Sequence, residues 1–412
     1  MLSVGIIGAG IAGLTTALEL HERGIPACVY DASSVLEVVG VGINILPHGS
    51  RNLGELGLAS ELAKVAVITQ ESVFFNRFGQ LIYREPAGRH AGYADPQYSI
   101  HRGDLQKVLL DAVRQRLGDD AVQLGNRALT VRQDGAGAHI VFADSDEMSP
   151  VYDVILGCDG VHSAVRKQLY PGEGAPHYTG VNMWRGVTIG DPILSGASMV
   201  RAGWLAAGKL VLYPIRNLDD GTGRQLYNWL AEVQTPEHRD RDWNRRGSIG
   251  DFLPHFADWH FDWLDVPDLF RRAEVILEYP MVDQDPLPRW SFGRVTLVGD
   301  AAHPMVPRGS NGAGQAILDA RAIADCLAAT PRDVISALER YERQRLPATA
   351  RVVLTNRTNP PDAILREVYE RSGDRPFARI EDVIDVRELS RLSDHYKQVT
   401  GMPVPPSADQ AR

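Results

Sequence analysis

Cysteine is scarce in this chain of 412 residues, and the few cysteines are far apart. Cys28, Cys158 and Cys326 share no CxxC spacing. This arrangement argues against a disulfide framework and against a thiolate metal site, so we predict that the protein binds no metal. Isolated thiols also favour a reducing compartment, and we expect a cytoplasmic protein.

Long apolar runs and basic blocks are also missing. No stretch reaches the ~18 uncharged apolar residues that a membrane span requires, so we expect no membrane partner. The apolar N-terminus does not resemble a signal peptide, because no Lys or Arg precedes it and its glycines recur at turn spacing. The formal net charge is −9. Without a basic block to neutralise a phosphate backbone, nucleic acid is not an expected partner.

The composition is that of a folded globular protein. Apolar residues make up 44% and charged residues 23% of the chain, and 39 Gly and 25 Pro are spread along it. These values exclude wholesale disorder, collagen and coiled coil. At roughly 150 residues per domain, the length allows two or three domains with a sizeable shared core.

The first thirty residues predict a strand, a tight turn, a helix and a second strand. The apolar run 4–7 ends in GAGIAG (residues 8–13), and the second strand, 27–30, ends in Asp31. In this dinucleotide-binding spacing the first glycine permits the turn, the second lets a pyrophosphate approach the backbone, and the third lets helix pack on strand. The phosphate then lies at the helix N-terminus, and Asp31 is placed to accept a hydrogen bond from a ribose hydroxyl.

Two later strands also end in turns that carry an acid. Residues 151–160 end in a turn with Asp159, and residues 293–303 contain a turn with Asp300. Asp300 is placed to hold a ribityl hydroxyl, or a water near the pyrophosphate. The glycines between 309 and 314 free backbone N–H groups and could open a helix whose positive end faces the N1/O2 edge of a flavin. A nicotinamide dehydrogenase needs no such loop, so these residues favour FAD over NAD.

Together the motifs resemble those of a known enzyme family. GAGIAG, CDGVHSAVR (158–166) and GDAAHPMVPRGSNGAGQ (299–315) are similar, in order and separation, to the cofactor motifs of the class A FAD-dependent aromatic hydroxylases, which are flavoprotein monooxygenases. HRGDLQ (101–106) resembles the family's FAD-contacting Arg segment, and GVGINI (40–45) resembles the loop beside the isoalloxazine. The resemblance covers roughly residues 1–350. Within the family, the chain most resembles the phenazine-1-carboxylate-type hydroxylases.

The resemblance implies an activity and its partners. NADH or NADPH, as a transient co-substrate, would reduce FAD, and O₂ would add at the flavin C4a. The resulting hydroperoxide would hydroxylate an electron-rich aromatic or N-heteroaromatic substrate, with or without a carboxylate. Because the flavin carries the chemistry, we expect no catalytic triad in the protein. The expected partners are a small aromatic substrate and O₂, and the protein is expected to be a monomer or a homodimer.

The residues expected to contact FAD come from all of these segments. They are Gly8, Gly10, Ala12, Gly13, Asp31, Val41, Gly42, Arg102, Leu124, Asp159, Asp300, Gly309, Asn311, Gly312 and Ala313. For three residues an ordinary structural role stays open. In one alternative, Asp159 and Arg166 contact the cofactor or lie on the surface that faces NAD(P)H. In the other, Asp159 caps the helix that follows it. Leu124 either meets adenine through its backbone or packs in the core.

The middle segment, 179–235, alternates apolar with polar or aromatic residues, which predicts an antiparallel sheet. Its large side chains could wall a flat aromatic pocket, although aromatics at period two are more often plain core. The expected pocket residues are Ile45, Trp184, Arg185, Tyr213, Trp229 and Arg308. Arg308 lies in the predicted flavin-side loop, where the related phenazine hydroxylases carry an apolar residue. Its guanidinium either favours a neutral or carboxylate-bearing ring over a cationic one, or points to solvent.

The predicted fold class is α/β. We expect a Rossmann-like FAD-binding domain with a mostly parallel sheet, an inserted antiparallel-sheet substrate domain, and C-terminal helices. The expected ranges are 1–70, 98–178 and 280–350 for the FAD-binding domain, 71–97 and 179–279 for the substrate-binding domain, and 351–412 for a C-terminal helical extension. Two other functions stay open: a flavin-dependent oxidase or reductase without oxygen insertion, and a non-catalytic FAD-binding protein.

Overall fold

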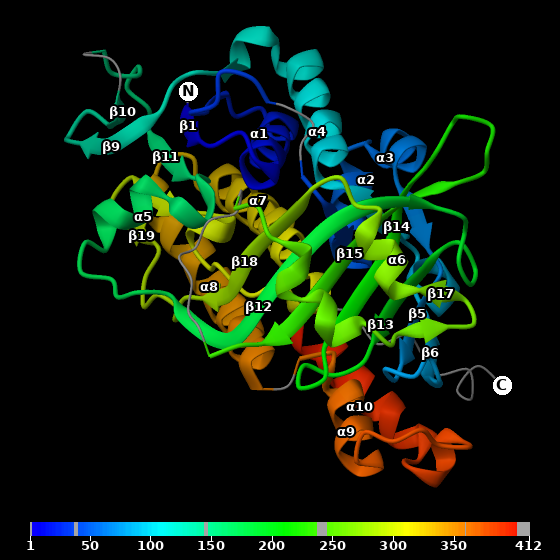
Figure 1. The fold of residues 1–412 in the computed structure, drawn as a ribbon. Helices are drawn as coiled ribbons and strands as arrows, with labels where there is room; N and C mark the ends of the chain where they lie inside the picture. Colours follow the sequence, from blue (N-terminus) through cyan, green and yellow to red (C-terminus); the bar gives the residue numbers. More distant parts are fainter. Residues whose placement is uncertain (1, 37–39, 144–146, 237–244, 359, 402–412) are drawn as a thin grey trace, which may run out of the picture.

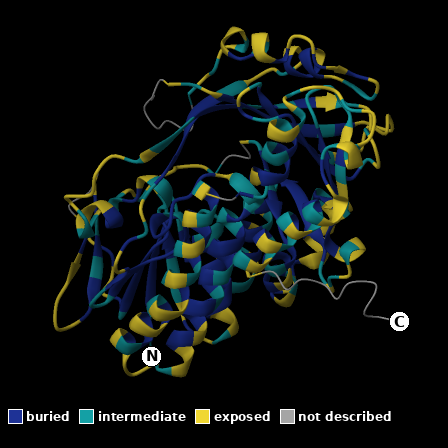
Figure 2. Cartoon of the chain, turned by 90° about the horizontal axis from the view of Figure 1, so that it is seen from below, coloured by how far each residue is buried: buried dark blue, intermediate teal, exposed yellow. Residues whose placement is uncertain are grey.

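Two large sheets, with helices packed on them, form the body of the molecule (Figure 1). The computed structural model describes residues 2–36, 40–143, 147–236, 245–358 and 360–401. Buried residues gather in the sheets and on the inward sides of the helices, whose outward sides are exposed (Figure 2). None of the helices in these ranges is both long and apolar enough to cross a membrane.

The six-stranded sheet is the predicted nucleotide-binding sheet, with the strand order β19-β20-β11-β1-β2-β8. Its strands are β1 (Val4–Ile7), β2 (Ala27–Tyr30), β8 (Val122–Gln123), β11 (Val154–Gly157), β19 (Ser291–Phe292) and β20 (Val295–Leu297). Neighbouring strands are parallel, except that β19 is antiparallel to β20. β1, β11 and β20 are buried along their whole length and, apart from Thr296, contain only apolar residues and glycine, as expected for parallel strands covered on both faces.

The helices around this sheet pack on one another. Helix α1 (Ile11–Glu22) contacts both α4 (Arg102–Leu117) and α7 (Gly312–Ala329), and α7 contacts α8 (Val334–Thr358). Their buried apolar side chains belong to one continuous core with the strands. Shorter helices complete this part of the chain, namely α2 (Pro47–Glu55), α3 (Ala59–Val65) and α5 (Ala164–Leu169). A hairpin of β9 (Ala128–Gln133) and β10 (Ala138–Phe142) lies beside them.

The seven-stranded sheet is mostly antiparallel, with the order β18-β12-β15-β14-β13-β5-β6. Its strands are β5 (Glu71–Phe75), β6 (Leu81–Pro86), β12 (His177–Gly190), β13 (Ser198–Ala202), β14 (Lys209–Asn217), β15 (Gln225–Gln234) and β18 (Ile276–Asp283). Side chains along each strand alternate between two faces. We call the face that carries Trp184 and Trp229 the outer face, and the face that carries Arg185 and Tyr213 the inner face.

Different elements cover the two faces. The outer face packs against aromatic side chains from residues 252–270. This segment contains β16 (His260–Phe261), β17 (Leu264–Asp265) and α6 (Val266–Arg271). The inner face meets a three-stranded sheet in which β7 (Gln97–His101) lies between β3 (Gly42–Ile45) and β4 (Val67–Thr69). Because β3 follows β2 in the chain, the inner face lies beside the segment that leads out of the nucleotide-binding sheet.

The C-terminal part of the described chain is helical. After α8 come α9 (Ala363–Ser372) and α10 (Val386–Val399), which contact one another, while α10 also contacts α8 and α9 contacts β5 (Figure 1). The predicted fold class is therefore confirmed: a mostly parallel sheet, an antiparallel sheet and C-terminal helices. The domain boundaries stay a prediction, and residues 402–412 of the expected extension lie outside the described residues.

Candidate cofactor and substrate site

The predicted cofactor motifs meet at one edge of the six-stranded sheet. Gly8, Asp31, Asp159 and Asp300 follow the carboxyl ends of β1, β2, β11 and β20, which are neighbours in the sheet. Ligands of open α/β sheets bind outside this edge. The residues chosen from distant parts of the sequence are thus brought to one place.

The three glycines of the turn after β1 have different surroundings. Gly8 has a φ of +105°, and a Cβ there would lie 2.5 Å from the carbonyl O of Cys158. A Cβ on Gly13 would lie 1.9 Å from the carbonyl O of Gly8, so α1 packs directly on the turn. A Cβ on Gly10 would meet no atom of the described residues within 4 Å. The turn needs Gly8 and Gly13 for its own packing and leaves open space at Gly10, as a pyrophosphate requires.

Asp31 holds this turn from the end of β2. Its Oδ2 accepts a hydrogen bond from the Ala9 N–H at 2.7 Å, and its Oδ1 accepts one from the Ser33 N–H at 2.8 Å. From α4, the Nε2 of Gln106 donates to the Ala9 carbonyl O at 2.7 Å. A carboxylate oxygen can accept more than one hydrogen bond, and Asp31 is only half-buried. The side chain therefore supports the turn and still has room to accept a ribose hydroxyl.

Asp300 carries a carboxylate that no described residue engages by a hydrogen bond or an ion pair. It is half-buried and lies in the short helical turn Gly299–Ala301. A Cβ on Gly312, the first residue of α7, would lie 3.8 Å from its Oδ1. The same turn touches α1, because a Cβ on Gly299 would lie 3.0 Å from the Cβ of Ala12. An unengaged acceptor here fits a hydroxyl donor such as the ribityl chain of FAD.

Helix α7 begins beside Asp300, at the residues expected to meet the flavin. Asn311 is the N-cap residue, but its side chain makes no cap hydrogen bond, and the first turn contains no acidic residue. The first N–H groups of a helix have no partner within it, and they carry the positive end of the helix dipole. Gly309, Gly312 and Ala313 lie at this same terminus. The terminus, the open space at Gly10 and the Asp300 carboxylate together fit FAD.

Asp159 has the structural role that the sequence left open. Its Oδ1 accepts a hydrogen bond from the Ser163 hydroxyl at 2.5 Å, and its Oδ2 accepts one from the Ala164 N–H at 2.7 Å. Burial raises the pKa of this carboxyl group. The carboxylate therefore caps the start of α5, and a contact with FAD stays a prediction.

Arg166 is not on a surface that NAD(P)H could reach, so that expectation is wrong. The residue is 5% exposed. Its Nη2 lies 2.5 Å from a carboxylate oxygen of Glu173, and its Nη1 donates to the carbonyl groups of Ala301 and Ala302. Arg166 instead links α5, which follows the turn after β11, to the turn after β20.

The loop that leads into β3 is bonded to the inner face of the antiparallel sheet. The Gly42 N–H donates to the Asn228 Oδ1 at 2.8 Å, and the Gly42 carbonyl accepts a hydrogen bond from Arg185 at 2.6 Å. A Cβ on Gly42 would lie 2.6 Å from both Asn228 and Ile215. Glycine at this position lets β3 approach the sheet, and both of its backbone polar groups are already used. A contact between Gly42 and FAD stays a prediction.

Ile45 packs in the main core, and its place in the substrate pocket stays a prediction. It is 1% exposed and belongs to the main core. A Cβ on Gly49 would lie 3.1 Å from its side chain, which places Ile45 against α2. Leu46, which follows β3 and is the N-cap residue of α2, lines a cavity.

Arg102 is exposed at the first position of α4. Its N–H donates to the carbonyl O of Val41 at 3.0 Å, and its side chain forms no ion pair with the described residues. This guanidinium is available for a phosphate or the flavin, and those contacts stay predictions. Leu124 and Ala313 are partly buried against the core, so the side chain of Leu124 has the packing role left open for it.

Strand alternation divides the predicted pocket residues of the antiparallel sheet between two faces. Trp184 and Trp229 belong to the outer face and lie in an aromatic cluster in which Phe252 stacks on Trp184. They are 3% and 0% exposed. Because Arg185 lies on the other face, the two tryptophans cannot share a pocket wall with it. Their packing fits the plain-core alternative that the sequence left open, and a place in the substrate pocket stays a prediction.

Arg185 and Tyr213 lie on the inner face, close to Tyr279. The Arg185 guanidinium carbon is 6.0 Å from the centre of the Tyr279 ring. Burial raises the pKa of Tyr213 to about 12, so this phenol stays protonated and able to donate a hydrogen bond at neutral pH. Methionine, valine and leucine side chains surround these groups on the same face. The inner face therefore offers an apolar wall with a few polar groups, which suits a small aromatic molecule.

The inner face also carries buried charges that the sequence reading missed. Lys209 is 1% exposed and forms ion pairs with Glu232 at 2.9 Å and with Asp362 at 2.5 Å. Arg201 pairs with the same Asp362 at 3.3 Å. The only sequence signal was an occasional charged residue within otherwise apolar strands. Asp362 comes from the start of α9, about 150 residues away, so no local pattern could reveal the pair.

Arg308 is partly buried, which favours an inward-facing guanidinium over the solvent-facing alternative. Its Nε is buried and has no hydrogen-bond partner among the described residues. Its charge contributes to the low pKa of Asp362, although the two groups form no ion pair. Arg185 likewise has no carboxylate partner in the described chain, and its Nε is also buried without a hydrogen bond. Neither guanidinium thus forms a direct ion pair with a carboxylate of the described residues.

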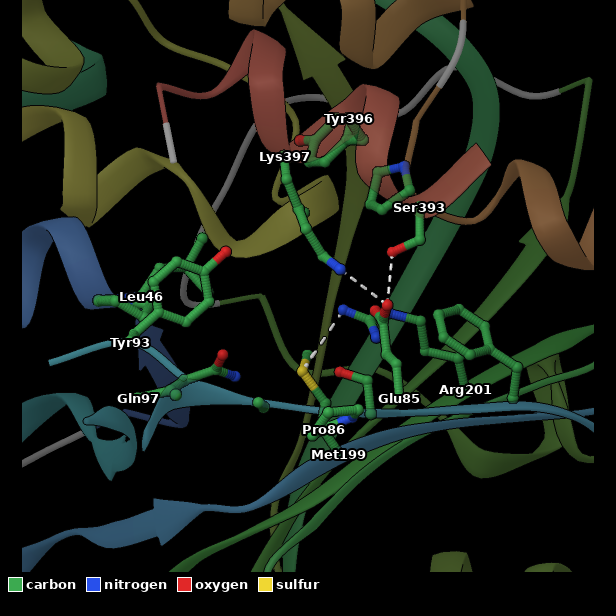
Figure 3. A pocket seen from close by; sticks show the side chains of 17 residues that line it. Leu46, Glu85, Pro86, Tyr93, Gln97, Met199, Arg201, Ser393, Tyr396 and Lys397 are labelled. Carbon is green, nitrogen blue, oxygen red and sulfur yellow. Dashed lines mark hydrogen bonds and ion pairs between the residues drawn. The ribbon is translucent and has the colours of Figure 1, made fainter. Parts of the chain in front are cut away.

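A cavity opens between the antiparallel sheet and helix α10 (Figure 3). Arg201 and Met199 line it from β13, Glu85 from β6, and Tyr396 and Lys397 from α10. It reaches Gly309 of the flavin-side loop. No sequence motif marked Tyr396 or Lys397, since the C-terminal helices carry no recognisable motif.

His48 is another residue that the motifs did not reveal. It follows the first residue of α2, and both of its ring nitrogens are buried without a hydrogen-bond partner in the described structure. Burial, helped by Arg345, lowers the pKa of His48 to about 4, so the ring is neutral. A Cβ on Gly314 would lie 2.7 Å from its Nε2, which places the ring against the first turn of α7. Buried polar atoms without partners thus gather where a ligand is expected.

No group of three or more His, Cys, Asp and Glu side chains in the described part of the chain is arranged to hold a metal ion.

Comparison with known sequences agrees with this geometry. The family model described as FAD binding domain matches residues 1–196 and 281–356. The phenazine 1,6-dicarboxylic acid hydroxylase PhzS of Lysobacter antibioticus is 43% identical over 402 residues, which cover 96% of each protein. The 3-amino-4-hydroxybenzoate 2-monooxygenase PtmB3 of Streptomyces platensis is 34% identical over 378 residues, which cover 90% of this chain and 87% of that protein.

Comparison with solved structures agrees as well. Klebsiella pneumoniae HpxO, solved in complex with FAD and uric acid, is similar with a TM-score of 0.77 and 24% identity, and the match covers 96% of both chains. That likeness shows the fold, and the sequence relatives show the family. The predicted cofactor, FAD, is confirmed. The chain belongs to the FAD binding domain family and, within it, to the class A FAD-dependent aromatic hydroxylases.

Proposed function

We propose that this protein uses NAD(P)H and O₂ to hydroxylate an aromatic or N-heteroaromatic ring that carries a carboxylate. The observation that carries the proposal is the charge of the inner face. Arg185, Arg201 and Lys209 lie there and Arg308 lies nearby, whereas Glu232 and Asp362 are the carboxylates paired with them in the described chain. An unpaired buried cation is costly, and a substrate carboxylate would neutralise it.

The names of two relatives point the same way. One acts on phenazine 1,6-dicarboxylic acid, and the other acts on 3-amino-4-hydroxybenzoate. Both molecules are aromatic carboxylates. We propose that this chain accepts a substrate of the same class, with a phenazine carboxylic acid as the first candidate because that relative has the higher identity.

The chain's own residues would hold the cofactor and orient the substrate. The turn at Gly10 leaves room for the pyrophosphate, Asp31 and Asp300 offer acceptors to hydroxyl groups, and the start of α7 offers N–H donors. When bound, FAD supplies the redox chemistry by which NAD(P)H and O₂ deliver one oxygen atom to the ring. Arg308 and Arg185 would bind the carboxylate, and the apolar side chains of the inner face would hold the ring and exclude water.

The sequence contains no second GxGxxG motif for NAD(P)H, so we propose that NAD(P)H binds transiently at the surface. The three cysteines are free, which suits the reducing cytoplasm expected from the sequence. The choice between NADH and NADPH is a readout of the experiment below.

The proposal is tested on purified protein with bound FAD. Oxidation of NADH and of NADPH is measured with phenazine-1-carboxylate, phenazine-1,6-dicarboxylate and 3-amino-4-hydroxybenzoate, and with uncarboxylated phenazine as the matched control. We expect the carboxylated rings to accelerate oxidation and to yield an oxygenated product whose oxygen comes from ¹⁸O₂. Acceleration that yields only hydrogen peroxide would instead support an oxidase, and bound FAD without any ring-dependent turnover would support a non-catalytic FAD-binding protein.

A further inference from the structure

We propose that Tyr396 of helix α10 is a positioning residue for the flavin-side loop, and that α10 forms one wall of the substrate site. This inference rests on the proposed function and deepens it. The family model ends at residue 356, so α10 lies outside the matched part of the chain.

The contacts of Tyr396 link three segments that are far apart in the sequence. Its hydroxyl donates to the Asn356 Oδ1 of α8 at 2.6 Å and accepts from the Asn311 Nδ2 at 3.0 Å. The Arg308 carbonyl O lies 3.3 Å from the same hydroxyl. Tyr396 is 5% exposed, and burial raises its pKa, so the hydroxyl keeps its proton at any working pH. The phenol is therefore a fixed hydrogen-bond junction.

The loop that it contacts has a backbone conformation that needs support. Gly309 has a φ of +71°, and Ser310, which is not a glycine, has a φ of +58°. Such a conformation is unfavourable for a non-glycine residue and persists only when the surroundings hold it. A Cβ on Gly309 would lie 2.0 Å from the Tyr396 hydroxyl, so the phenol sits directly against the loop. Because Asn311 is the N-cap of α7, the same contact fixes where α7 begins.

Helix α10 is also fastened on the opposite side of the cavity. Lys397 forms an ion pair with Glu85 of β6 at 2.9 Å, and the Ser393 hydroxyl donates to the same carboxylate at 2.6 Å (Figure 3). Beyond the helix, the Thr400 carbonyl accepts a hydrogen bond from the Gln315 Nε2 of α7 at 3.3 Å. The helix thus bridges the antiparallel sheet and the start of α7, and the cavity lies between these two attachments.

This arrangement gives Tyr396 a role in positioning rather than in chemistry. It touches the loop through Asn311 and Gly309, and the loop carries Arg308, the proposed carboxylate ligand. Losing the hydroxyl should let the loop leave its strained conformation. FAD should stay bound, because in the described structure Gly10, Asp31 and Asp300 form no hydrogen bond with α10. Substrate should bind less tightly.

The test compares Tyr396→Phe with Tyr369→Phe, a matched control. Tyr369 lies on α9 in the same helical part of the chain, and its hydroxyl makes no hydrogen bond with the described residues. In the holoenzyme, we expect Tyr396→Phe to speed amide hydrogen exchange at residues 309–314 by about fivefold or more, which corresponds to one lost hydrogen bond. We expect the KM for the aromatic substrate to rise by a similar factor, with more hydrogen peroxide formed per NAD(P)H. The control variant should match the wild type in amide exchange, KM and peroxide yield.

Two features keep the outcomes distinct. Hydrogen exchange and the visible spectrum of bound FAD need no turnover, so they report on the loop even where no tested ring is hydroxylated and the proposed function fails. Should Tyr396→Phe lose its fold, Asn356→Leu removes the other partner of the phenol and is expected to give the same local exchange. Unchanged exchange at 309–314, with an unchanged KM and unchanged peroxide yield, in a folded variant would overturn the role of Tyr396.

Discussion

At the scale of single residues, the glycines of the turn after β1 separate the cofactor's space from the protein's own packing. Gly8 and Gly13 are required because a Cβ would collide with backbone, whereas Gly10 borders open space. All three were predicted from the GAGIAG spacing. The spacing is informative because each glycine answers a local steric need that no other residue type meets.

Gly10→Val should therefore leave the fold intact and abolish FAD binding. The new side chain meets no described protein atom within 4 Å of its Cβ, but it occupies the space expected for the pyrophosphate. The measurement is the visible absorbance of the purified variant together with its melting temperature. We expect a colourless protein that melts within a few degrees of wild-type apoprotein; a yellow variant with one FAD per chain would show that the pyrophosphate lies elsewhere.

Arg308→Met should alter substrate preference without releasing FAD. The guanidinium lacks a carboxylate partner in the described chain, and a charge-assisted hydrogen bond contributes about 2 kcal/mol, so the KM for a carboxylated ring should rise roughly thirtyfold. Uncarboxylated rings should be unaffected. Arg308→Lys, which keeps the charge, is the control, and its KM for a carboxylated ring should lie between those of the wild type and Arg308→Met. Equal KM values for all three proteins with a carboxylated substrate would remove Arg308 from the site.

Some residue roles could not be predicted because they depend on long-range contacts. Asp159 was correctly placed in a turn at the end of β11, but its cap on α5 and its possible cofactor contact have the same local sequence signature. Tyr396 had no signature at all, since its contact with Asn311 spans 85 residues of chain. Local patterns encode turns and strands, whereas pairs of this kind arise only from the fold.

At the scale of elements, the strands of the nucleotide-binding sheet were predictable and the faces of the antiparallel sheet were not. In β1, β2, β11 and β20 an apolar run is followed by a turn that contains Gly or Asp, and few structures other than a buried strand have this sequence pattern. Along β12, alternation requires Trp184 and Arg185 to point to opposite faces. It does not say which face meets the cofactor, because that depends on how the sheet packs against β3.

Trp229→Phe tests the assignment of the outer face. Trp229 is fully buried against Phe252 and Phe270 and donates a hydrogen bond to Thr188 at 3.0 Å. A smaller ring should lower the free energy of unfolding by about 2 kcal/mol through the cavity and the lost hydrogen bond. Denaturant unfolding measures that loss, and the substrate KM should not change. A raised KM at unchanged stability would return Trp229 to the pocket.

The attachment of α9 to the inner face makes stability depend on pH. Burial alone would raise the pKa of Asp362, but Lys209 and Arg201 beside it hold the pKa below its ordinary value. A carboxyl group with a lowered pKa stabilises the fold above its ordinary pKa of about 4, and this stabilisation disappears as the pH falls through the folded value. Denaturant midpoints between pH 5 and pH 2 should therefore fall less steeply for Asp362→Asn than for the wild type. Identical pH slopes would contradict the ion-pair network.

At the scale of the whole molecule, the chain brings a cofactor edge, an inner sheet face and a C-terminal helix to one site. The family resemblance predicted the cofactor edge, and the composition gave no reason to expect a competing class such as a nucleic-acid binder. The role of the C-terminal helix was missed because the C-terminal helices carry only ordinary amphipathic patterns and none of the family's motifs. The charge of the inner face emerges only when strands from residues 185–232 lie side by side.

The central claim is that an anionic aromatic ring binds beside FAD on the inner face. The most direct measurement is a titration of the purified holoenzyme with phenazine-1-carboxylate and with phenazine, followed by the flavin absorbance and by the mass of the product formed with NAD(P)H and ¹⁸O₂. The account predicts that the carboxylated ring shifts the flavin spectrum, binds at least about tenfold more tightly than phenazine, and acquires one labelled oxygen atom. Equal binding of the two rings, or turnover that leaves the carboxylated ring without labelled oxygen, would contradict it.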